Sequence, residues 1–579
     1  MKKLLHYIKG YEKQTLLAPL FKMLEACFEL LVPLVVARLI DTGIRNGDAG
    51  FIWVQCGLLV VLAVVGLASS LTAQYFSARA ALGFGTALRR ALFAHIDTFS
   101  YTELDGIGTP TLVTRMTSDI NQLQNGLNMT LRLLLRCPFI VLGALVMSVT
   151  ISVRLALLFL AVTVLVSLII YFIMRATMPV YRQAQNTLDQ VTLLTRENYV
   201  GARVVRAFAR QPDEIADFTQ TNDRLKAVQL AAGRVSALMN PLTYLVVNLA
   251  IVVILLAGGR QVDTGALTQG QIIALINYMS QILINLLRMA DLIISITRAL
   301  ASGQRVLEIL DTATTMPDPA AGVPSPIPAA PAVRFDGVSF TYKGAGAPSL
   351  TNITFAAAAG ETLGVIGGTG SGKSTLVDLI PRFYEASTGA VQLYGHPVGA
   401  YGFEGLRRMV GMVPQQAVLF TGSIRDNMKW ACPDATDAQI WQALEIAQAA
   451  DFVRAKPGAL DERVETGGRN FSGGQRQRLT IARALVGQPQ ILILDDSASA
   501  LDYATDAALR GAIREKTGGT TVFLVSQRAA TVRQADRILV LDDGVLVGCA
   551  PHAELLQTCP VYREICLSQL SKEEVGKTL

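Results

Sequence analysis

Residues 471–502 read FSGGQRQRLTIARALVGQPQILILDDSASALD, and this stretch predicts part of an α/β domain. A helix is expected to begin at Ser472, because the apolar residues that follow it recur at helical spacing. The apolar run 491–494 then predicts a buried strand, which ends at two aspartates, Asp495 and Asp496. Free N–H groups at the start of a helix bind anions, and a carboxylate at the end of such a strand can hold a metal ion.

A second strand–helix junction lies upstream, where the apolar run 363–366 is followed by GGTGSGKST. The pattern G-x-x-x-x-G-K-S between a strand and a helix is that of a phosphate-binding loop, although alone it would also fit a kinase or a GTPase. Lys373 would neutralise the β and γ oxygens of ATP, while Ser374 and Asp495 would ligate Mg²⁺. The loop residues expected at the nucleotide are Gly367, Gly370, Ser371, Gly372, Lys373, Ser374 and Thr375.

The N-terminal half of the chain differs in composition from the rest. Of the 579 residues, 51% are hydrophobic and 17% are charged, and the mean hydropathy is +0.40. Nearly all long apolar runs come before about residue 300. A helix that crosses a bilayer needs about 20 mostly apolar residues. Six segments meet that standard: approximately 15–40, 51–78, 130–152, 154–176, 236–259 and 271–297.

These patterns predict the domain organisation. We expect an all-α polytopic membrane domain over residues 1–311, with six transmembrane helices that have long cytoplasmic extensions. A linker rich in proline and alanine covers 312–332. Short apolar strands that alternate with helices predict an α/β P-loop domain over 333–570, followed by a tail at 571–579.

Basic residues gather in the long gaps after the second and fourth predicted spans. The positive-inside rule therefore places both termini and the soluble half in the cytoplasm of a cell membrane protein. The net charge of +6 forms no single stripe, so membrane lipid rather than nucleic acid is the expected partner of these charges. Both gaps predict long helical hairpins, whose turns near 101–108 and 199–203 would dock onto what lies below.

Several polar residues lie inside the predicted spans, where each is costly unless it faces a cavity or a partner. Glu25 and Glu29 lie four residues apart on one face of the first helix. They could line an aqueous cavity and favour cationic, amphipathic cargo, or either could pair with Arg288, which Asp291 could also neutralise. The residues expected at a substrate cavity are Glu25, Glu29, Asn277, Gln281, Asn285 and Arg288.

The Ser-Gly-Gly-Gln tetrapeptide at 472–475 begins a second anion-binding helix, which makes sense if it binds a nucleotide held by another copy of the domain. With it, the whole chain resembles a half-transporter of the ABC exporter family. The resemblance implies that Tyr342 stacks on adenine and that Gln415 reaches the magnesium. It also implies that the loop 499–502 joins two nucleotide-binding domains, and residues 196–208 resemble the family's second cytoplasmic loop. The residues implied to contact the other nucleotide are Ser472, Gly473, Gly474, Gln475 and Asp502.

Three positions depart from the family pattern. Asp496 replaces the usual glutamate, Gln527 replaces the usual switch histidine, and Thr466 replaces a common glutamate. A general base must lie within about 2.6–3.2 Å of the proton that it takes, and aspartate is shorter than glutamate by one carbon–carbon bond. Gln527 can hydrogen-bond a γ-phosphate but carries no charge. We therefore expect the chain's own site to bind ATP and to hydrolyse it slowly.

The resemblance extends to the degenerate-site subunits of heterodimeric exporters. In a head-to-tail heterodimer, the intact tetrapeptide would complete the site of a partner half-transporter that carries the glutamate and the histidine. The expected function is ATP-driven export of amphipathic compounds, whether drugs, lipids or peptides. The alternatives are an exporter-fold importer of metal chelates and a regulatory or channel-like membrane protein gated by ATP. A soluble ATPase that acts on nucleic acid is excluded by the six spans.

Overall fold

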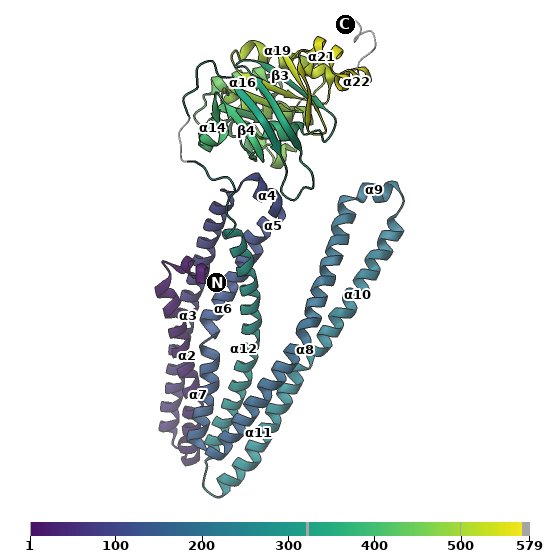
Figure 1. Cartoon of the computed structure of the whole chain (residues 1–579). Coiled ribbons are helices and arrows are strands. Elements are labelled where there is room, and N and C mark those ends of the chain that lie inside the picture. Colours follow the sequence, from purple (N-terminus) through teal and green to yellow (C-terminus); the bar gives the residue numbers. More distant parts are fainter. Residues whose placement is uncertain (1, 320–323, 498, 570–579) are drawn as a thin grey trace. The chain divides into compact units, whose positions relative to one another are not determined.

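The computed structural model describes residues 2–319, 324–497 and 499–569, which form two units (Figure 1). Unit 1 consists of Met1–Asp97 and Pro110–Thr312, and unit 2 consists of Thr98–Thr109 and Ala313–Leu579. The predicted tail, 571–579, and residues 320–323 of the predicted linker lie outside the described residues. A short segment near residue 100 thus groups with the soluble half rather than with the helices that flank it in sequence.

Unit 1 is built from helices. They are α1 (Lys2–Leu5), α2 (Glu12–Arg38), α3 (Ala49–Ile96), α5 (Thr109–Thr114), α6 (Ile120–Leu133), α7 (Arg136–Ile151), α8 (Val153–Val200), α9 (Ala202–Ala207), α10 (Gln211–Ala237), α11 (Met239–Asp263) and α12 (Gln269–Leu310). Among the described residues, five helical stretches are long and apolar enough to cross a membrane: Ala49–Ile96, Thr109–Ile151, Val153–Val200, Gln211–Asp263 and Gln269–Leu310. They contain five of the six predicted spans, and the helical polytopic membrane domain is confirmed.

The remaining predicted span, 15–40, coincides with α2, which carries more charged residues than the other five stretches do in their apolar parts. Its middle carries Lys22, Glu25 and Glu29, and the Lys22 ammonium lies 2.5 Å from the Glu25 carboxylate. The helix packs along α3 and against α7 and α12. Charges at membrane depth need protein partners, so α2 depends on the helices packed against it.

Close helix packing and one break shape the bundle. Gly126 of α6 lies so near α12 that a Cβ there would be 2.3 Å from the Cβ of Ala299, and small residues at crossings are typical of membrane helices. The helix is interrupted between α6 and α7, where residues 134–135 form a turn. Pro138 explains the break, because proline lacks an N–H and its ring clashes with the carbonyl four residues earlier, at Leu134.

Within unit 1, α8 and α10 lie side by side as a long pair joined by α9 (Figure 1). α11 follows α10 and packs against α8 and α12. This pair is the second hairpin predicted from the sequence. The side chains at its tip, Tyr199, Val200, Val204 and Phe208, are largely exposed, so the tip has an apolar surface.

Unit 2 contains a six-stranded sheet in the order β12–β11–β3–β10–β9–β6. Its strands are β3 (Thr362–Gly367), β6 (Val410–Val413), β9 (Ile491–Asp495), β10 (Thr521–Val525), β11 (Arg537–Asp542) and β12 (Val545–Ala550). Neighbouring strands are parallel except for β11 and β12, which pair antiparallel at one edge. A parallel sheet is covered on both faces, and β3, β9 and β10 are accordingly buried. The predicted α/β fold class is confirmed.

A second sheet and a helical region complete unit 2. The antiparallel sheet has the order β2–β1–β4–β5 and consists of β1 (Val333–Phe340), β2 (Leu350–Ala357), β4 (Thr388–Leu393) and β5 (His396–Pro397), while β7 (Gly422–Ser423) pairs with β8 (Arg463–Val464). The helices are α13 (Lys373–Asp378), α14 (Phe403–Met409), α15 (Ile424–Lys429), α16 (Asp437–Ile446), α17 (Ala450–Arg454), α18 (Gly473–Val486), α19 (Tyr503–Lys516), α20 (Ala529–Val532), α21 (His552–Thr558) and α22 (Pro560–Gln569). One apolar core joins α15, α16 and α18 to β9 and β10.

The tip of the first hairpin, α4 (Tyr101–Ile107), belongs to unit 2. A capping box fixes its start, because the Ser100 N–H donates to the Glu103 carboxylate at 2.9 Å. The centroid of the Tyr101 ring lies 4.8 Å from that of Phe383, and the Tyr384 hydroxyl donates to the Asp105 carboxylate at 2.6 Å. The prediction that this tip docks onto the soluble half is confirmed.

Candidate nucleotide-binding site

Four elements predicted from the sequence meet at one edge of the six-stranded sheet. The phosphate loop follows β3, Gln527 lies just beyond β10, Asp495 ends β9, and Gln415 lies just beyond β6. These strands are parallel neighbours in the order β3–β10–β9–β6, so their carboxyl ends share an edge. Ligands of open α/β sheets bind outside the carboxyl ends of the strands. This edge is therefore the candidate site.

Glycine backbone conformations keep the phosphate loop open. Gly370 and Gly372 have φ angles of +82° and +91°, which residues with a Cβ rarely adopt. A Cβ at Gly372 would lie 2.6 Å from the Ser349 carbonyl oxygen, whereas the Cβ position at Gly370 has nothing within 4 Å. The loop thus combines a tight fit on one side with open space on the other, where phosphates would meet the N–H groups that begin α13.

The Lys373 ammonium group is turned onto the loop. It donates to the carbonyl oxygens of Gly367 at 3.1 Å and Gly368 at 2.6 Å. Burial lowers the pKa of Lys373, and the charges of Asp495 and Asp496 oppose that shift. Because the side chain is flexible and carries a compact charge, it can turn from these carbonyls to phosphate oxygens without a change in the backbone.

Ser374 and Asp495 form the side of the site where Mg²⁺ would bind. The Ser374 hydroxyl hydrogen-bonds the Asp495 carboxylate; burial raises the pKa of Asp495, and this hydrogen bond opposes the rise. Mg²⁺ usually binds through one or two protein oxygens together with substrate phosphates. The Ser374 hydroxyl and the Asp495 carboxylate could supply these protein oxygens. In the described part of the chain, no group of three His, Cys, Asp or Glu side chains could hold a metal by itself. Bound Mg²⁺ would neutralise charge on the transferred phosphate.

Two of the three positions that depart from the family pattern, Asp496 and Gln527, lie at neighbouring strand ends, and the third, Thr466, lies in a short turn before α18. Asp496 follows β9 with a φ of 43°, and its N–H donates to the Val525 carbonyl of β10 at 2.9 Å. Burial raises the pKa of Asp496, while the charge of Arg528 and a hydrogen bond from Gln415 oppose the rise. Gln527 is exposed, and its carbonyl accepts from Gln569 at 2.8 Å. Both residues therefore lie at the same edge of the sheet as the phosphate loop, just after the buried strands β9 and β10.

Tyr342 lies beside the phosphate loop. Its hydroxyl oxygen is 3.0 Å from that of Thr375, and its ring meets the Tyr384 ring edge-on at 5.2 Å between centroids. A cavity of about 380 Å³ opens next to it and has Asp105 and Lys343 in its lining. An aromatic ring held at the rim of such a cavity can stack on a planar base.

The tetrapeptide 472–475 caps α18 and lies at the surface. The Ser472 hydroxyl accepts from the Gln475 N–H at 3.3 Å, and the Gln475 side chain accepts from the Ser472 N–H at 3.1 Å. Ser472 and Gly473 are exposed and Gly474 is partly exposed. Asp502 caps α19 in the same manner, since it accepts from a backbone N–H at 2.8 Å. The start of α18 is thus formed and accessible to a second molecule.

The glutamates predicted to line a cavity belong instead to a charge network inside unit 1. Arg136, at the start of α7, lies 2.6 Å from the Glu29 carboxylate and 3.8 Å from that of Glu25, which also pairs with Lys22. Their partner is therefore Arg136 rather than Arg288. Two positive and two negative charges cancel, so this network offers no net negative charge to a cation.

The amides of α12 in the predicted cavity set have local partners. Asn285 accepts from Arg136 at 3.3 Å and donates to the Gln281 carbonyl at 2.9 Å. The Gln281 side chain reaches a backbone carbonyl of α2 at 3.4 Å. Asn277 donates to the carbonyl four residues earlier at 3.0 Å, and both Asn277 and Arg288 are exposed. Asn285 and Gln281 thus link α12 to α7 and α2, whereas Asn277 is bonded within α12.

An open cavity of about 1190 Å³ lies between α6, α8 and α12 of unit 1. Its lining includes Asn125, Tyr181, Arg182, Asp291 and Arg298, and none of the six residues predicted from the sequence lines it. Helical spacing could show that Arg182 and Arg298 lie in polar extensions, but only the fold brings the two extensions together.

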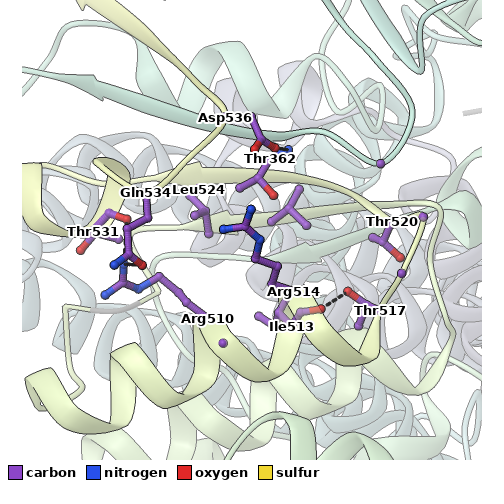
Figure 2. A pocket seen from close by; sticks show the side chains of 15 residues that line it. Thr362, Arg510, Ile513, Arg514, Thr517, Thr520, Leu524, Thr531, Gln534 and Asp536 are labelled. Atoms are coloured by element: carbon purple, nitrogen blue, oxygen red, sulfur yellow. Dashed lines mark hydrogen bonds between the residues drawn. The ribbon is translucent and has the colours of Figure 1, made fainter. Parts of the chain in front are cut away.

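A smaller cavity, of about 340 Å³, lies along α19 (Figure 2). Its lining includes Thr362 and Thr520, which lie at the amino ends of β3 and β10. Arg510 in its wall is held by Asp506 at 3.1 Å and by the Thr531 carbonyl at 3.2 Å. Because ligands of parallel sheets bind at the carboxyl ends and this arginine is already paired, the cavity is distinct from the nucleotide site.

Comparison with known proteins identifies the family. Residues 15–287 match the ABC transporter transmembrane region, and residues 350–499 match the ABC transporter family. An uncharacterized ABC transporter ATP-binding protein of Mycobacterium tuberculosis is 37% identical over 581 residues, which cover 98% of each chain. A fatty acid ABC transporter ATP-binding/permease protein of the same species is 34% identical over 461 residues, covering 80% of this chain and 72% of that protein. The structure of a bacterial Atm1-family ABC exporter with ATP bound has the same fold, with a TM-score of 0.81 and 23% identity over 97% of this chain and 99% of that one.

The chain belongs to the ABC transporter family. It joins a multi-pass membrane domain to an ABC ATPase domain in one polypeptide, which is the architecture of an ABC exporter half-transporter. The resemblance drawn from the tetrapeptide 472–475 and the phosphate loop is thereby confirmed at the level of the family and the fold. An ABC ATPase domain implies ATP binding, and the edge described above is the candidate site for it.

Proposed function

We propose that the chain is one subunit of a heterodimeric exporter that uses ATP to move amphipathic compounds out across the membrane. The observation that carries this proposal is an asymmetry between two half-sites. The tetrapeptide 472–475 is intact, capped and exposed, whereas Asp496 and Gln527 stand at the two catalytic positions of the chain's own pocket. The intact half would complete a partner's ATP site, and the altered half would hold ATP.

The chemistry of the altered half favours binding over hydrolysis. The Asp496 carboxylate is shorter than that of a glutamate and is already hydrogen-bonded by Gln415. Gln527 can donate to a γ-phosphate but cannot accept and return a proton. Lys373, Ser374 and the loop backbone keep the groups that bind phosphate. Since general-base assistance is typically worth about 10²–10⁴-fold in rate, hydrolysis in this pocket should be slow by about that factor.

The partner in this proposal is a second ABC half-transporter with a glutamate and a histidine at these positions. It would contact the tetrapeptide 472–475, the loop around Asp502 and the tip at α9. Apolar and aromatic side chains are enriched where proteins associate, and the exposed Tyr199, Val204 and Phe208 supply such a surface. Both termini and the ATPase unit would lie in the cytoplasm.

An amphipathic cargo has two supports. A relative is described as a fatty acid transporter, and the cavity between α6, α8 and α12 has both polar and apolar residues in its lining. The hypothesis of a cavity that selects cations through Glu25 and Glu29 has lost its basis, because both carboxylates pair with Arg136.

The test is the ATPase activity of the purified full chain in lipid nanodiscs, without other subunits. We expect negligible turnover, with normal labelling by a photoreactive ATP analogue. The double variant D496E/Q527H should raise turnover by about 10²–10⁴-fold, and adding K373A should abolish the gain. Robust turnover of the unmodified chain that K373A abolishes would refute the proposal.

A further inference from the structure

The cavity between α6, α8 and α12 carries an imbalance of charge. Arg182 of α8 and Arg298 of α12 line it together with Asp291 of α12. The ion pairs of the described part of unit 1 involve none of these three residues. Two guanidinium groups against one carboxylate give the lining a net positive charge, in contrast to the neutral network around Arg136.

The same cavity has apolar side chains next to its arginines. Met178 precedes Arg182 by four residues, and Ile294 precedes Arg298 by four, so on each helix an apolar side chain lies one turn from an arginine on the same face. Met129 of α6 adds a third apolar residue. Methionine adapts to apolar groups of different shape. The arrangement therefore suits a molecule with an anionic head and a variable apolar chain.

We propose that this cavity binds the anionic head group of an amphipathic cargo, a carboxylate or a phosphate, between Arg182 and Arg298. The inference rests on the proposed transport of amphipathic compounds and adds the charge of the head group. Guanidinium groups bind carboxylates and phosphates through two parallel hydrogen bonds and are weakly hydrated for a cation. Asp291 repels the same head group, so its neutralisation strengthens binding.

The experiment is photolabelling of the full chain in nanodiscs of a zwitterionic phospholipid, with no ATP and no other subunit. The probes are four dodecyl amphiphiles with a diazirine in the chain, whose heads are a carboxylate, a phosphate, an alcohol and an amine. Mass spectrometry measures labelling of the peptides that contain Met129, Met178 and Ile294. We expect the two anions to label these peptides about tenfold or more above the alcohol and the amine, since a hydrogen bond to a charged group is worth about 1.5–3 kcal/mol.

Matched variants separate recognition from folding and from lipid contact. R182Q/R298Q should reduce anion labelling to the level of the alcohol, R182K/R298K should retain most of it, and D291N should raise it. R90Q removes an exposed arginine of α3 outside the cavity and should change nothing. Equal loss in R90Q, as for arginines that contact lipid head groups, would overturn the proposal, as would equal labelling by the amine. Comparison of the carboxylate with the phosphate tells which head group is preferred.

The two proposals can fail separately. Labelling requires neither hydrolysis nor a partner subunit, so robust ATPase activity of the chain alone would refute the heterodimer and leave the head-group preference intact. Conversely, negligible ATPase activity together with labelling that ignores head-group charge would overturn the cavity proposal alone.

Discussion

The two hairpin tips of this half-transporter, α4 and α9, are similar in length but differ in their surroundings. α4 has seven residues, and its Tyr101 ring and Asp105 carboxylate contact aromatic residues of the ATPase unit. α9 has six residues, and the apolar side chains around it, including Tyr199 and Val204, are largely exposed. The tip at α4 packs within unit 2, whereas the apolar side chains of the tip at α9 are exposed in unit 1.

The difference shows where the proposed heterodimer can be tested. A large contiguous apolar patch that is exposed on a protein surface often marks an interaction site. The tip at α4 is packed within unit 2, and in the proposed heterodimer the tip at α9 would dock onto the partner. The four predictions that follow test this contrast, beginning with the largest expected effect.

The largest effect should come from a charge introduced at the exposed tip, α9. We expect V204E to reduce pairing by about tenfold or more, because an apolar contact is lost and a charge is buried. The measurement is the amount of the partner half-transporter that co-purifies with the tagged V204E chain, compared with the tagged wild-type chain. The control is A216E, at an exposed position on α10, which should pair normally. Normal pairing of V204E would show that α9 is no docking element.

The tip at α4 should affect how the stability of unit 2 depends on pH. Burial raises the pKa of Asp378 to about 7, and the charges of Asp495 and of Asp105 from α4 add to the rise. Because the folded-state pKa lies above its usual value of 3.8, the folded unit holds this proton more tightly than the unfolded chain does. The stability gained at low pH is therefore lost as pH rises toward about 7.

Thermal unfolding of the nucleotide-free chain checks this. D378N should flatten the fall in unfolding temperature between about pH 4 and about pH 7, and D105N should flatten it in part. An unchanged pH dependence in D378N would mean that this carboxyl titrates normally. The exposed tip at α9 should contribute no comparable pH dependence.

A matched pair of tyrosines gives a smaller effect. Y101A removes a ring that packs on Phe383, so it should lower the stability of unit 2 by about 1–2 kcal/mol. Y199A removes a ring that is 81% exposed, so it should change stability by less than about 0.5 kcal/mol. Urea denaturation of both variants measures the difference. Equal destabilisation would remove the contrast between the tips.

The smallest effect is expected at the ion pair beside α9. Arg210 and Asp213 approach to 2.7 Å, but their side chains are 68% and 60% exposed. Exposed pairs of this kind contribute little, so D213N should change the free energy of unfolding by less than about 0.5 kcal/mol. A larger loss in the same denaturation experiment would show that the tip is held more firmly than its exposure implies.

Local patterns predicted the ATPase unit well, because its chemistry depends on short stretches. The glycines before Lys373 and the capped start at Ser472 are each decided by neighbouring residues. The intramembrane partners could not be predicted in this way. Arg136 contacts Glu29 across 107 positions, at a break that Pro138 imposes, and nothing in the spacing of either segment pairs them. Arg182 and Arg298 meet one cavity for the same reason: packing, not sequence distance, brings helices together.

The network of α2 and α7 also bears on how the protein is made. α2 leaves the ribosome before α7, and a charged residue at the centre of a helix costs about 2.5–3.5 kcal/mol on insertion scales. Lys22 and Glu25 can neutralise each other within α2, but Glu29 obtains its partner only when Arg136 has been synthesised. The carboxylate of Glu29 is therefore neutralised by Arg136 only after α7 has been made, so one ion pair makes α2 depend on a helix that is synthesised later.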